Sequence, residues 1–441
     1  MADPQIARRT AAAGSQTPRD DGAVRRQPGF IRAIGLGLIT GAADDDPSAI
    51  GTYASAGARF GPALLWMAPV TFPMMFAVVY LSAKLGQVAG QGLFAVLRKN
   101  YPRKVLYPTL IGVLIGNTIE AGADLGGVAA AINLLIPIPI AILVPLVGIG
   151  LVCLQTWGSY AMMRNVFRIL ALALLAYIPA AVLAKPDWFD VLKNSLIPTI
   201  RFDREFLSMV VAVIGTTLSA YLYTWQSNEE VEEEKESGRV LLSQRRGATK
   251  QELRHSQRDV LFGMFFSNVA MYFIILATAS TLFREGNTDI ESAAQAAQSL
   301  APLAGNAAKV LFALGVIGVG FLAVPVMTGG AAYDLCQTVG WKYGLGKQPV
   351  QAKRFYLAIA FFTLIGIAMN FLGINPMKAL VVAGIVQGFS TPPLMLLIML
   401  MTNKRSIMGD KVNGRAMNIL GWITTAAIFA ASIALVLTWF L

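Results

Sequence analysis

Long apolar runs recur along the whole chain, and they constrain its fold more than any other feature of the sequence. Many of them extend over about 20 residues, the length at which a helix crosses a bilayer core about 30 Å thick. The runs are continuous and do not alternate with polar residues, which excludes a membrane β-barrel. Only 14% of the residues are charged, against about 25% in soluble domains. The sequence therefore predicts an all-α integral membrane protein.

The apolar runs predict eleven transmembrane helices, which places the two termini on opposite sides of the membrane. The first, third and eighth runs are long enough for a tilted or interrupted helix. Residues 1–29 have no apolar segment, so we expect a disordered cytoplasmic tail before a single transmembrane transporter domain at 30–441. The predicted spans are 31–58, 63–90, 105–135, 138–157, 166–184, 206–227, 259–283, 307–336, 355–373, 376–400 and 416–440.

Basic residues indicate the orientation. If the N-terminus is inside, the predicted inner segments hold 28 of the 36 Lys and Arg residues, as the positive-inside rule requires. We therefore expect a multi-pass protein of the cell (plasma) membrane with a cytoplasmic N-terminus and an outside C-terminus. The bias also explains the net charge of +11, so no nucleic acid partner is needed. The oligomeric state stays open.

No catalytic arrangement is found along the chain. The two cysteines, Cys153 and Cys336, lie in apolar segments and form no disulfide framework. No nucleophile is paired with a base, and no metal-ligand spacing of a catalytic kind occurs. The single histidine, His255, falls in a basic inner segment. We therefore expect no enzyme and no resident cofactor.

The ionisable residues well inside the predicted spans are acidic. Such residues are costly in a membrane and by default mark ion or proton pathways. A pathway lined by carboxylates selects cations, and oxygen ligands suit hard divalent ions. These residues are Asp44, Asp45 and Asp46 in the first span, Glu120 and Asp124 in the third, and Asp334 in the eighth.

Pro47 interrupts the first span directly after Asp46. Its ring breaks the helix, and the carbonyls from about Ala42 to Asp44 then need partners, which a bare or partly hydrated cation can supply. We expect Asp46 to face this cation. Asp44 and Asp45 are expected to cap a helix end, to pair with other side chains or to line the entrance to the site. A simple proline kink with paired aspartates is the alternative.

A similar interruption is predicted in the sixth span, where Gly215, Thr216, Thr217 and Ser219 crowd a position at mid-membrane. These residues either donate and accept hydrogen bonds for the backbone groups that a helix break leaves unpaired, or pack against a neighbouring helix. Breaks in the first and sixth spans are what a 5+5 inverted repeat predicts. The two repeats are expected at about 31–184 and 206–400, with 416–440 as an extra helix.

Two further polar features lie outside the breaks. Glu120 and Asp124 are four residues apart and share a helix face, so they are candidates for a proton relay or a cation exit, unless one pairs with a basic residue. The segment 228–258 begins Asn-Glu-Glu-Val-Glu-Glu-Glu. Its simplest interpretation is a solvated extension of the sixth helix, and the alternative is an acidic vestibule that concentrates cations.

From about residue 30 the chain resembles the NRAMP family of divalent-metal transporters. Asp46-Pro47-Ser48-Ala49 corresponds to the family's Asp-Pro-Gly-Asn, and Ser219-Ala220-Tyr221 to its Met-Pro-His after a Gly-x-Thr lead. Residues 300–308 and the Pro392-Pro393 pair are similar to the family as well. The resemblance implies a LeuT-type fold with broken first and sixth helices.

The departures from the family pattern suggest a different cation. Of the family's side-chain ligands only Asp46 is kept, since Ala49 stands at the Asn position and Ser219 at the Met position. We expect a metal site at these residues, with carbonyls near Ala43 and Thr216. Without sulfur, such a site favours hard ions, and Mg²⁺ keeps several waters when bound. The pattern is most similar to the NRAMP-related magnesium transporters, with Mn²⁺ as a second substrate.

Proton coupling is the remaining question. The family's sixth-helix histidine is Tyr221 here, and a tyrosine, with an ordinary pKa of about 10, carries no protons at pH 7. Asp124 falls at the family's acidic third-helix position, and Gln387 in the tenth span is either a ligand or a helix–helix contact. We expect uncoupled import of Mg²⁺. The alternatives are proton-coupled Mn²⁺/Fe²⁺ transport, Na⁺-coupled amino-acid transport on the same fold, and a metal sensor that does not transport.

Overall fold

The computed structural model describes residues 36–158 and 172–437, and throughout these two ranges the regular elements are helices. This confirms the predicted all-α fold class. The expected tail at 1–29 lies outside the described residues. The principal helices are α1 (Leu36–Asp44), α2 (Pro47–Phe60), α3 (Met67–Ala89), α5 (Arg103–Leu135), α6 (Ile140–Trp157), α10 (Arg204–Thr217), α11 (Ala220–Glu236), α13 (Lys250–Ser280), α16 (Ala308–Val339), α17 (Lys353–Met369), α18 (Pro376–Thr402) and α20 (Arg415–Leu437).

The shorter elements connect or extend these helices. Two of them, η2 and α8, cover the described part of the fifth predicted span, whose beginning at 166–171 is not described. Two more short helices, α14 and α15, precede the eighth predicted span. The shorter elements are η1 (Gly61–Leu64), α4 (Leu93–Asn100), η2 (Leu172–Ala176), α8 (Tyr177–Leu183), α9 (Trp188–Leu196), α12 (Leu242–Arg245), α14 (Ala293–Gln298), α15 (Ala301–Ala304), η3 (Gly305–Ala307) and α19 (Arg405–Met408).

In the described ranges, eight helical segments are long and apolar enough to cross a membrane. They match the second to fourth, sixth to eighth, tenth and eleventh predicted spans. The first predicted span is divided between α1 and α2, and the ninth is the 17-residue helix α17. Helices therefore lie at all the predicted spans, as far as these are described.

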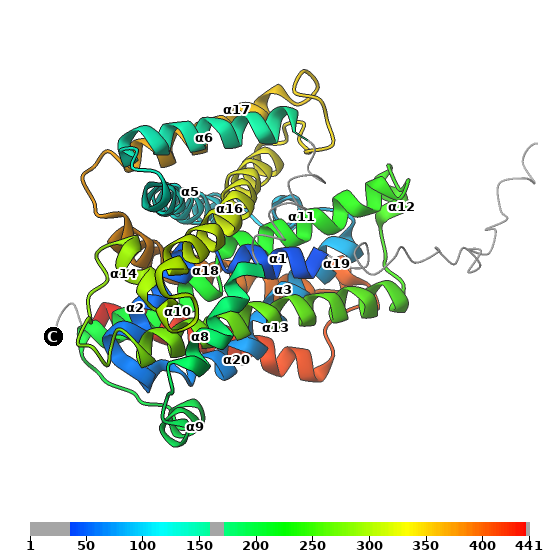
Figure 1. The fold of residues 1–441 in the computed structure, drawn as a ribbon. Coiled ribbons are helices and arrows are strands. Elements are labelled where there is room, and N and C mark those ends of the chain that lie inside the picture. Colours follow the sequence, from blue (N-terminus) through cyan, green and yellow to red (C-terminus); the bar gives the residue numbers. More distant parts are fainter. Residues whose placement is uncertain (1–35, 159–171, 438–441) are drawn as a thin grey trace, which may run out of the picture. The chain divides into compact units, whose positions relative to one another are not determined.

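Both predicted breaks are present. Asp45 and Asp46 separate α1 from α2 (Figure 1), and Leu218 and Ser219 separate α10 from α11. Pro47 is the first residue of α2, where its missing N–H costs nothing. Asp46 caps the same helix by accepting the Ala49 N–H at 2.7 Å. The residue pattern that breaks one helix therefore also starts the next.

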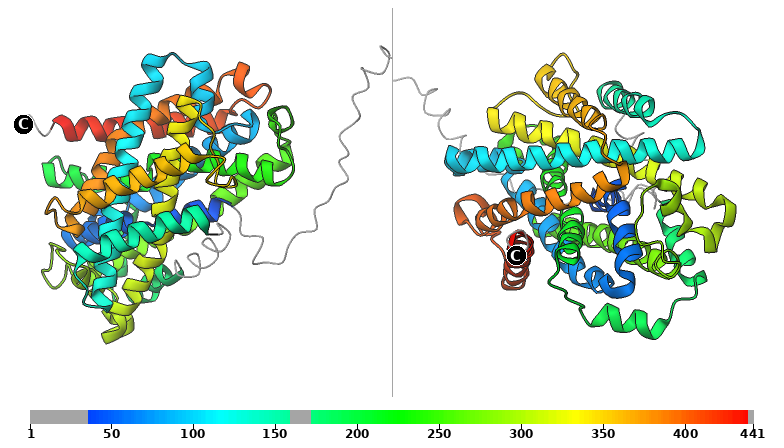
Figure 2. Two further views of the ribbon diagram at one scale, coloured as in Figure 1. Left: turned by 90° about the horizontal axis from the view of Figure 1, so that it is seen from above. Right: turned by 90° about the vertical axis from the view of Figure 1, so that its left-hand side faces the viewer.

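The broken helices pack among α5, α13, α16 and α18. α1 packs mainly on α13, α10 on α18, and α11 on α3 and α16. α6 and α17 lie side by side against α5, as Figure 1 shows. The last helix, α20, lies beside α18, red next to orange in Figure 2. This arrangement leaves the two breaks without exposed surface, since Asp46 and Ser219 are both 0% exposed.

The acidic run after the sixth span differs from its simplest interpretation. It continues α11 as far as Glu236, as an extension of the helix would. However, Asn228, Glu229 and Glu230 are 2–6% exposed, so this first part of the run is buried against neighbouring helices and is not solvated. The prediction of a solvated extension is wrong here because α3, α16 and α4 pack on α11, and Ser256 of α13 donates a hydrogen bond to Glu230.

Close contact between α10 and α18 depends on glycine. A β-carbon at Gly215 would overlap the carbonyl oxygen of Gly384 and lie 2.9 Å from the Cα of Gly388. Both of these neighbours are backbone atoms of α18, so they cannot rotate away. The small residues therefore set the distance between the sixth-span break and the tenth span.

We predict that Gly215→Val lowers the free energy of unfolding by about 1–3 kcal/mol, because the added side chain overpacks a contact between two backbones. The measurement is the thermal unfolding temperature of the purified protein in detergent. Gly112→Ala is the matched control, since a β-carbon there meets no atom within 4 Å. Equal unfolding temperatures for the two variants would contradict the packing argument.

Candidate functional site

Asp46 lies at the first break with its carboxylate enclosed by protein donors. Its Oδ1 accepts the Ser48 hydroxyl at 2.7 Å and the Ala49 N–H at 2.7 Å. Its Oδ2 lies 3.0 Å from the Tyr221 hydroxyl. Asp46 is therefore at the break as the sequence predicts, and its carboxylate faces hydroxyl groups from both interrupted helices.

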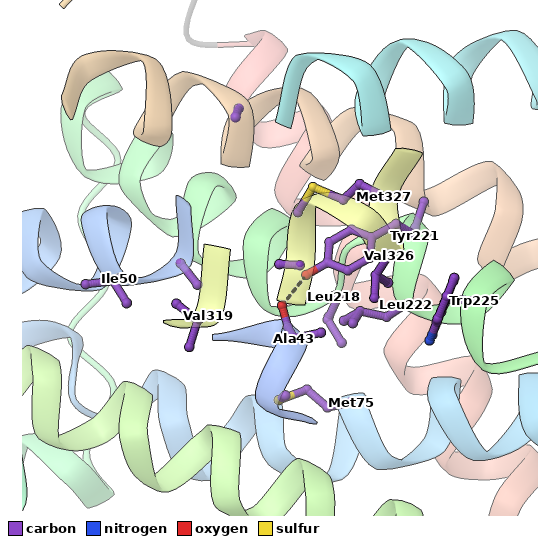
Figure 3. Close-up of a cluster of buried hydrophobic side chains, with 14 of the residues drawn as sticks. Ala43, Ile50, Met75, Leu218, Tyr221, Leu222, Trp225, Val319, Val326 and Met327 are labelled. Carbon is purple, nitrogen blue, oxygen red and sulfur yellow. Dashed lines mark hydrogen bonds between the residues drawn. The ribbon is translucent and has the colours of Figure 1, made fainter. Parts of the chain in front are cut away.

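The Tyr221 hydroxyl lies between two of the predicted cation ligands. Besides Asp46, it lies 2.8 Å from the carbonyl oxygen of Ala43, which is one of the carbonyls freed at the end of α1. Figure 3 shows this contact as a dashed line, with Leu218, Leu222 and Met327 also drawn around the break. Tyr221 thus supplies the freed carbonyl with the partner that the sequence assigned to a cation.

Glu120 joins the two breaks to the tenth span. Its Oε1 accepts the Ser48 hydroxyl at 3.2 Å and the Ser219 hydroxyl at 3.0 Å. Its Oε2 accepts the Gln387 side-chain N–H at 2.7 Å, and the same nitrogen also reaches Asn117. Gln387 therefore makes helix–helix hydrogen bonds in this arrangement, and Glu120 belongs to the site itself.

Asp124 and Thr216 complete the set around Ser48. Asp124 Oδ1 accepts the Ser48 N–H at 2.8 Å, and its Oδ2 has no hydrogen-bond partner. The Thr216 hydroxyl lies 3.2 Å from that of Ser48, while its carbonyl accepts the Ser219 hydroxyl at 3.0 Å. Ala49 contributes a backbone N–H and no side-chain ligand.

Asp44 and Asp45 face away from this set and share one donor on α13. The Ser267 hydroxyl lies 2.5 Å from Asp44 Oδ2 and 3.1 Å from Asp45 Oδ1. The other oxygen of each carboxylate is buried without a partner. The two aspartates are therefore paired through a serine, and no basic side chain in the described ranges neutralises them.

The second break is closed by hydroxyl groups as well. The Leu218 carbonyl accepts hydrogen bonds from the hydroxyls of Tyr223 and Thr391. Tyr53 on α2 lies 2.8 Å from the Thr217 hydroxyl and so links the two breaks. Unwound backbone at this depth is stable only when such groups satisfy it.

Electrostatics is the dominant feature of the site. Five carboxylates, those of Asp44, Asp45, Asp46, Glu120 and Asp124, are each 0% exposed. None of the ion pairs in the described part of the chain involves any of them. Burying an unpaired charge is very costly, so these groups require protons or a cation. A divalent ion is well suited because it balances two carboxylates at once.

An apolar pocket approaches the break from one side. It is small and partly open and starts at Pro47, with Ile50, Phe312, Met377 and Leu380 among its lining residues. None of its lining residues is titratable. Pro47 therefore separates this pocket from Asp46, and the carboxylates lie in an enclosed state of the protein.

Comparison with known proteins identifies the family. The profile described as natural resistance-associated macrophage protein-like, Nramp, matches residues 37–438, which is most of the chain. The chain belongs to the Nramp family. This confirms the resemblance seen in the sequence, and the Nramp chain is a membrane transporter and not an enzyme.

Curated relatives agree with this assignment. The Nramp chain is 26% identical to the divalent metal cation transporter MntH of Klebsiella pneumoniae (strain 342), covering 91% of each protein. It is 24% identical to MntH of Bacillus subtilis (strain 168), covering 97% of this chain and 98% of the relative.

Two solved structures share the fold. The first is the Eremococcus coleocola manganese transporter, with a TM-score of 0.72 and 17% identity, covering 92% of this chain and 86% of that one. The second is Mhp1, a nucleobase-cation-symport-1 family transporter, with a TM-score of 0.57 and 12% identity, covering 92% of each chain. These neighbours confirm the LeuT-type fold of the Nramp chain.

Sequence reasoning missed several residues of the site. Ser48 was treated only as a motif position, although a serine two residues after an aspartate commonly turns back towards it. Ser267, Tyr53 and Thr391 come from other helices, and no local pattern marks them. In the Nramp chain they contact the breaks because α13, α2 and α18 pack there.

We predict that Ser267→Ala lowers stability by about 1–3 kcal/mol, because Asp44 and Asp45 lose a donor that they share in a buried place. The measurement is thermal unfolding in detergent. Thr156→Ala is the control, because the Thr156 hydroxyl bonds to a carbonyl of its own helix. If both variants unfold at the same temperature, the shared hydroxyl is not needed to hold the two carboxylates.

Proposed function

We propose that this chain imports a partly hydrated divalent cation, Mg²⁺ first and Mn²⁺ second, without proton coupling. The cation would lie between the two breaks with Asp46 as its main side-chain ligand. Ser219, the carbonyls of Ala43 and Thr216, and Glu120 would assist it directly or through water. The observation that carries the proposal is the set of oxygen atoms gathered there from α1, α2, α5, α10 and α11.

The chemistry of these groups supports a hard ion. The side chains that approach Asp46 and Glu120 offer oxygen or amide groups. A sulfur near the breaks, that of Met271, lies 3.9 Å from the Thr217 hydroxyl and contacts neither carboxylate by hydrogen bonding. Oxygen donors suit Mg²⁺ and Mn²⁺, whereas softer ions gain most from sulfur.

The hydrogen bonding around the breaks supports a hydrated ion. The hydroxyls of Ser48, Ser219 and Tyr221 lie within hydrogen-bond distance of Asp46 or Glu120, and each has one proton to donate. Waters bound to a cation present the same kind of donor, so they can replace these hydroxyls one for one. Mg²⁺ gives up its waters reluctantly, which makes it the natural occupant.

Passage needs the enclosed site to open. Asp46 has no exposed surface, and the Tyr221 hydroxyl lies between Asp46 and Ala43. A cation therefore enters only when the tyrosine moves aside or becomes one of its ligands. Alternating opening of the two sides is the usual behaviour of transporters built on broken helices.

The position of the family's sixth-span histidine holds a residue unsuited to proton transfer. The chain has one histidine, and it lies on the exposed surface of α13. Tyrosine at position 221 is a poor proton carrier near pH 7. The membrane potential is a sufficient drive, since a divalent ion gains about 4.6 kcal/mol per 100 mV on moving inward.

A second candidate is proton-coupled Mn²⁺/Fe²⁺ transport of the ordinary Nramp type. The free Oδ2 of Asp124 favours it, because a buried carboxylate with an open oxygen can carry a proton. The relatives named as divalent metal cation and manganese transporters also agree with it.

The topology completes the proposal. We infer a plasma-membrane protein with its N-terminus in the cytoplasm and its C-terminus outside, from the distribution of Lys and Arg. The two repeats would extend over about 31–184 and 206–400, with the last helix outside them.

The test is ion flux into proteoliposomes that contain a pH dye, with Mg²⁺, Mn²⁺, Fe²⁺ and Ca²⁺ supplied in turn. We expect Mg²⁺ and Mn²⁺ uptake without acidification, and little Fe²⁺ uptake. Asp46→Ala should reduce uptake at least 10-fold, because the main ligand is lost. Near-normal flux in that variant would remove Asp46 from the site, and metal-driven acidification would favour the second candidate.

Ser219→Met should shift the ion ranking towards Mn²⁺ and Cd²⁺, because a thioether replaces a hydroxyl beside the cation. Ser219→Leu is the matched control, since it adds similar bulk without sulfur. The measurement is the ratio of Cd²⁺ to Mg²⁺ uptake in the same liposomes. An equal ratio in the two variants would mean that sulfur does not reach the ion.

A further inference from the structure

Glu230 is a further buried carboxylate, away from both breaks. It lies on α11, nine residues beyond Tyr221, which corresponds to about 14 Å along a helix. It is 4% exposed and joins three helices. Its Oε1 accepts hydrogen bonds from Gln226 at 3.0 Å and from Ser256 on α13 at 2.8 Å. Its Oε2 accepts one from Gln87 on α3 at 2.7 Å.

The partners of Glu230 are neutral. No ion pair in residues 36–158 and 172–437 involves this carboxylate, in contrast to Glu234 one turn later, which pairs with Arg239. Neutral donors stabilise a buried carboxylate less than a positive charge does. Glu230 thus resembles the acids at the breaks: a negative group is buried where only a mobile ion or a proton can balance it.

Oxygen atoms of suitable type surround it. The side-chain oxygen of Gln87 is buried without a partner, and this residue is 9% exposed. The side-chain oxygen of Gln226 accepts the hydroxyl of Thr40 at 2.5 Å. We define the Glu230 cluster as Glu230, Gln87, Gln226, Ser256 and Thr40. It offers carboxylate, amide and hydroxyl oxygens, which are ligands for hard divalent ions.

The cluster is connected to the first break by α1. Thr40 lies one helical turn before Asp44, and Gln226 lies five residues, about 8 Å, beyond Tyr221. The Thr40–Gln226 hydrogen bond therefore ties α1, which ends at the first break, to the Glu230 cluster on α11. In the orientation inferred from the basic residues, the direction from Asp46 to Glu230 is inward.

We propose that the Glu230 cluster is a second binding site for a divalent cation, which the ion occupies after it leaves Asp46 on its way to the cytoplasm. The inference rests on the proposed function. A transit site must hold the ion weakly, and one carboxylate with neutral oxygens meets this requirement better than the five carboxylates at the breaks. The amide and hydroxyl groups rotate to present oxygen when the ion arrives.

The competing role is purely structural, in which Glu230 ties α3, α11 and α13 together. The two roles respond differently to Glu230→Gln. Glutamine retains the size of the side chain and its ability to bond with the neighbours, but it removes the negative charge. A structural tie therefore tolerates the change, whereas a cation site does not. Glu236→Gln is the matched control, because Glu236 is exposed at the end of the same helix.

The experiment counts bound Mn²⁺ by electron paramagnetic resonance in the purified full-length protein, with thermal unfolding measured in parallel. We expect Glu230→Gln to bind one ion fewer than the wild type, Asp46→Ala to lose a different ion, and the double variant to lose both. Mg²⁺ uptake should fall at least 5-fold in Glu230→Gln and stay unchanged in Glu236→Gln.

An unchanged number of bound ions in Glu230→Gln would overturn the second site, whether or not transport falls. Unchanged binding in Asp46→Ala would instead count against the proposed function. Because the two variants are compared separately, the failure of one assignment is distinguishable from the failure of the other.

Discussion

The structure depends on one electrostatic constraint: five carboxylates lie at the helix breaks with no exposed surface and no ion pair to a described basic side chain. Charges in such a place are stable only with protons or a cation. The packing of α5, α13, α16 and α18 around the breaks encloses these groups and so preserves their need for positive charge. A protein built for stability alone would bury apolar side chains there, which supports the functional role proposed for the carboxylates.

Hydroxyl groups make this arrangement possible between transport events. Ser48 lies within hydrogen-bond distance of Asp46 and Glu120, and Tyr221 of Asp46 and the Ala43 carbonyl. These contacts place hydroxyl donors beside buried oxygen atoms at the breaks. A hydroxyl is easily replaced by a water molecule of a hydrated ion, because both donate in the same way. The same groups therefore support the closed state and prepare it for a cation.

Membership of the Nramp family explains the architecture, while the departures within the motifs explain the chemistry proposed for this chain. Serine at position 219 contacts Glu120 and two carbonyls of its own break, a role that a methionine side chain has no donor to perform. Tyrosine at position 221 reaches across to the first break. Ser219 contacts Glu120, and Tyr221 contacts Asp46 and Ala43, so both residues border the site proposed for the cation.

The sequence by itself determined the helices and the first break, because span length, proline position and intramembrane acids are local properties. The second break was predicted from small and hydroxyl residues five spans later, where an inverted repeat would place it. It also identified Asp46 and Glu120, since acidic residues within an apolar span stand out in the sequence, whereas Tyr221 was identified through the resemblance to the family. The tertiary structure decided which oxygen atoms meet. Ser267 reaches Asp44, Gln387 reaches Glu120, and Gln87 reaches Glu230, and each pair is separated by more than 140 residues. No local pattern specifies such contacts, because they arise only when helices distant in the chain pack side by side.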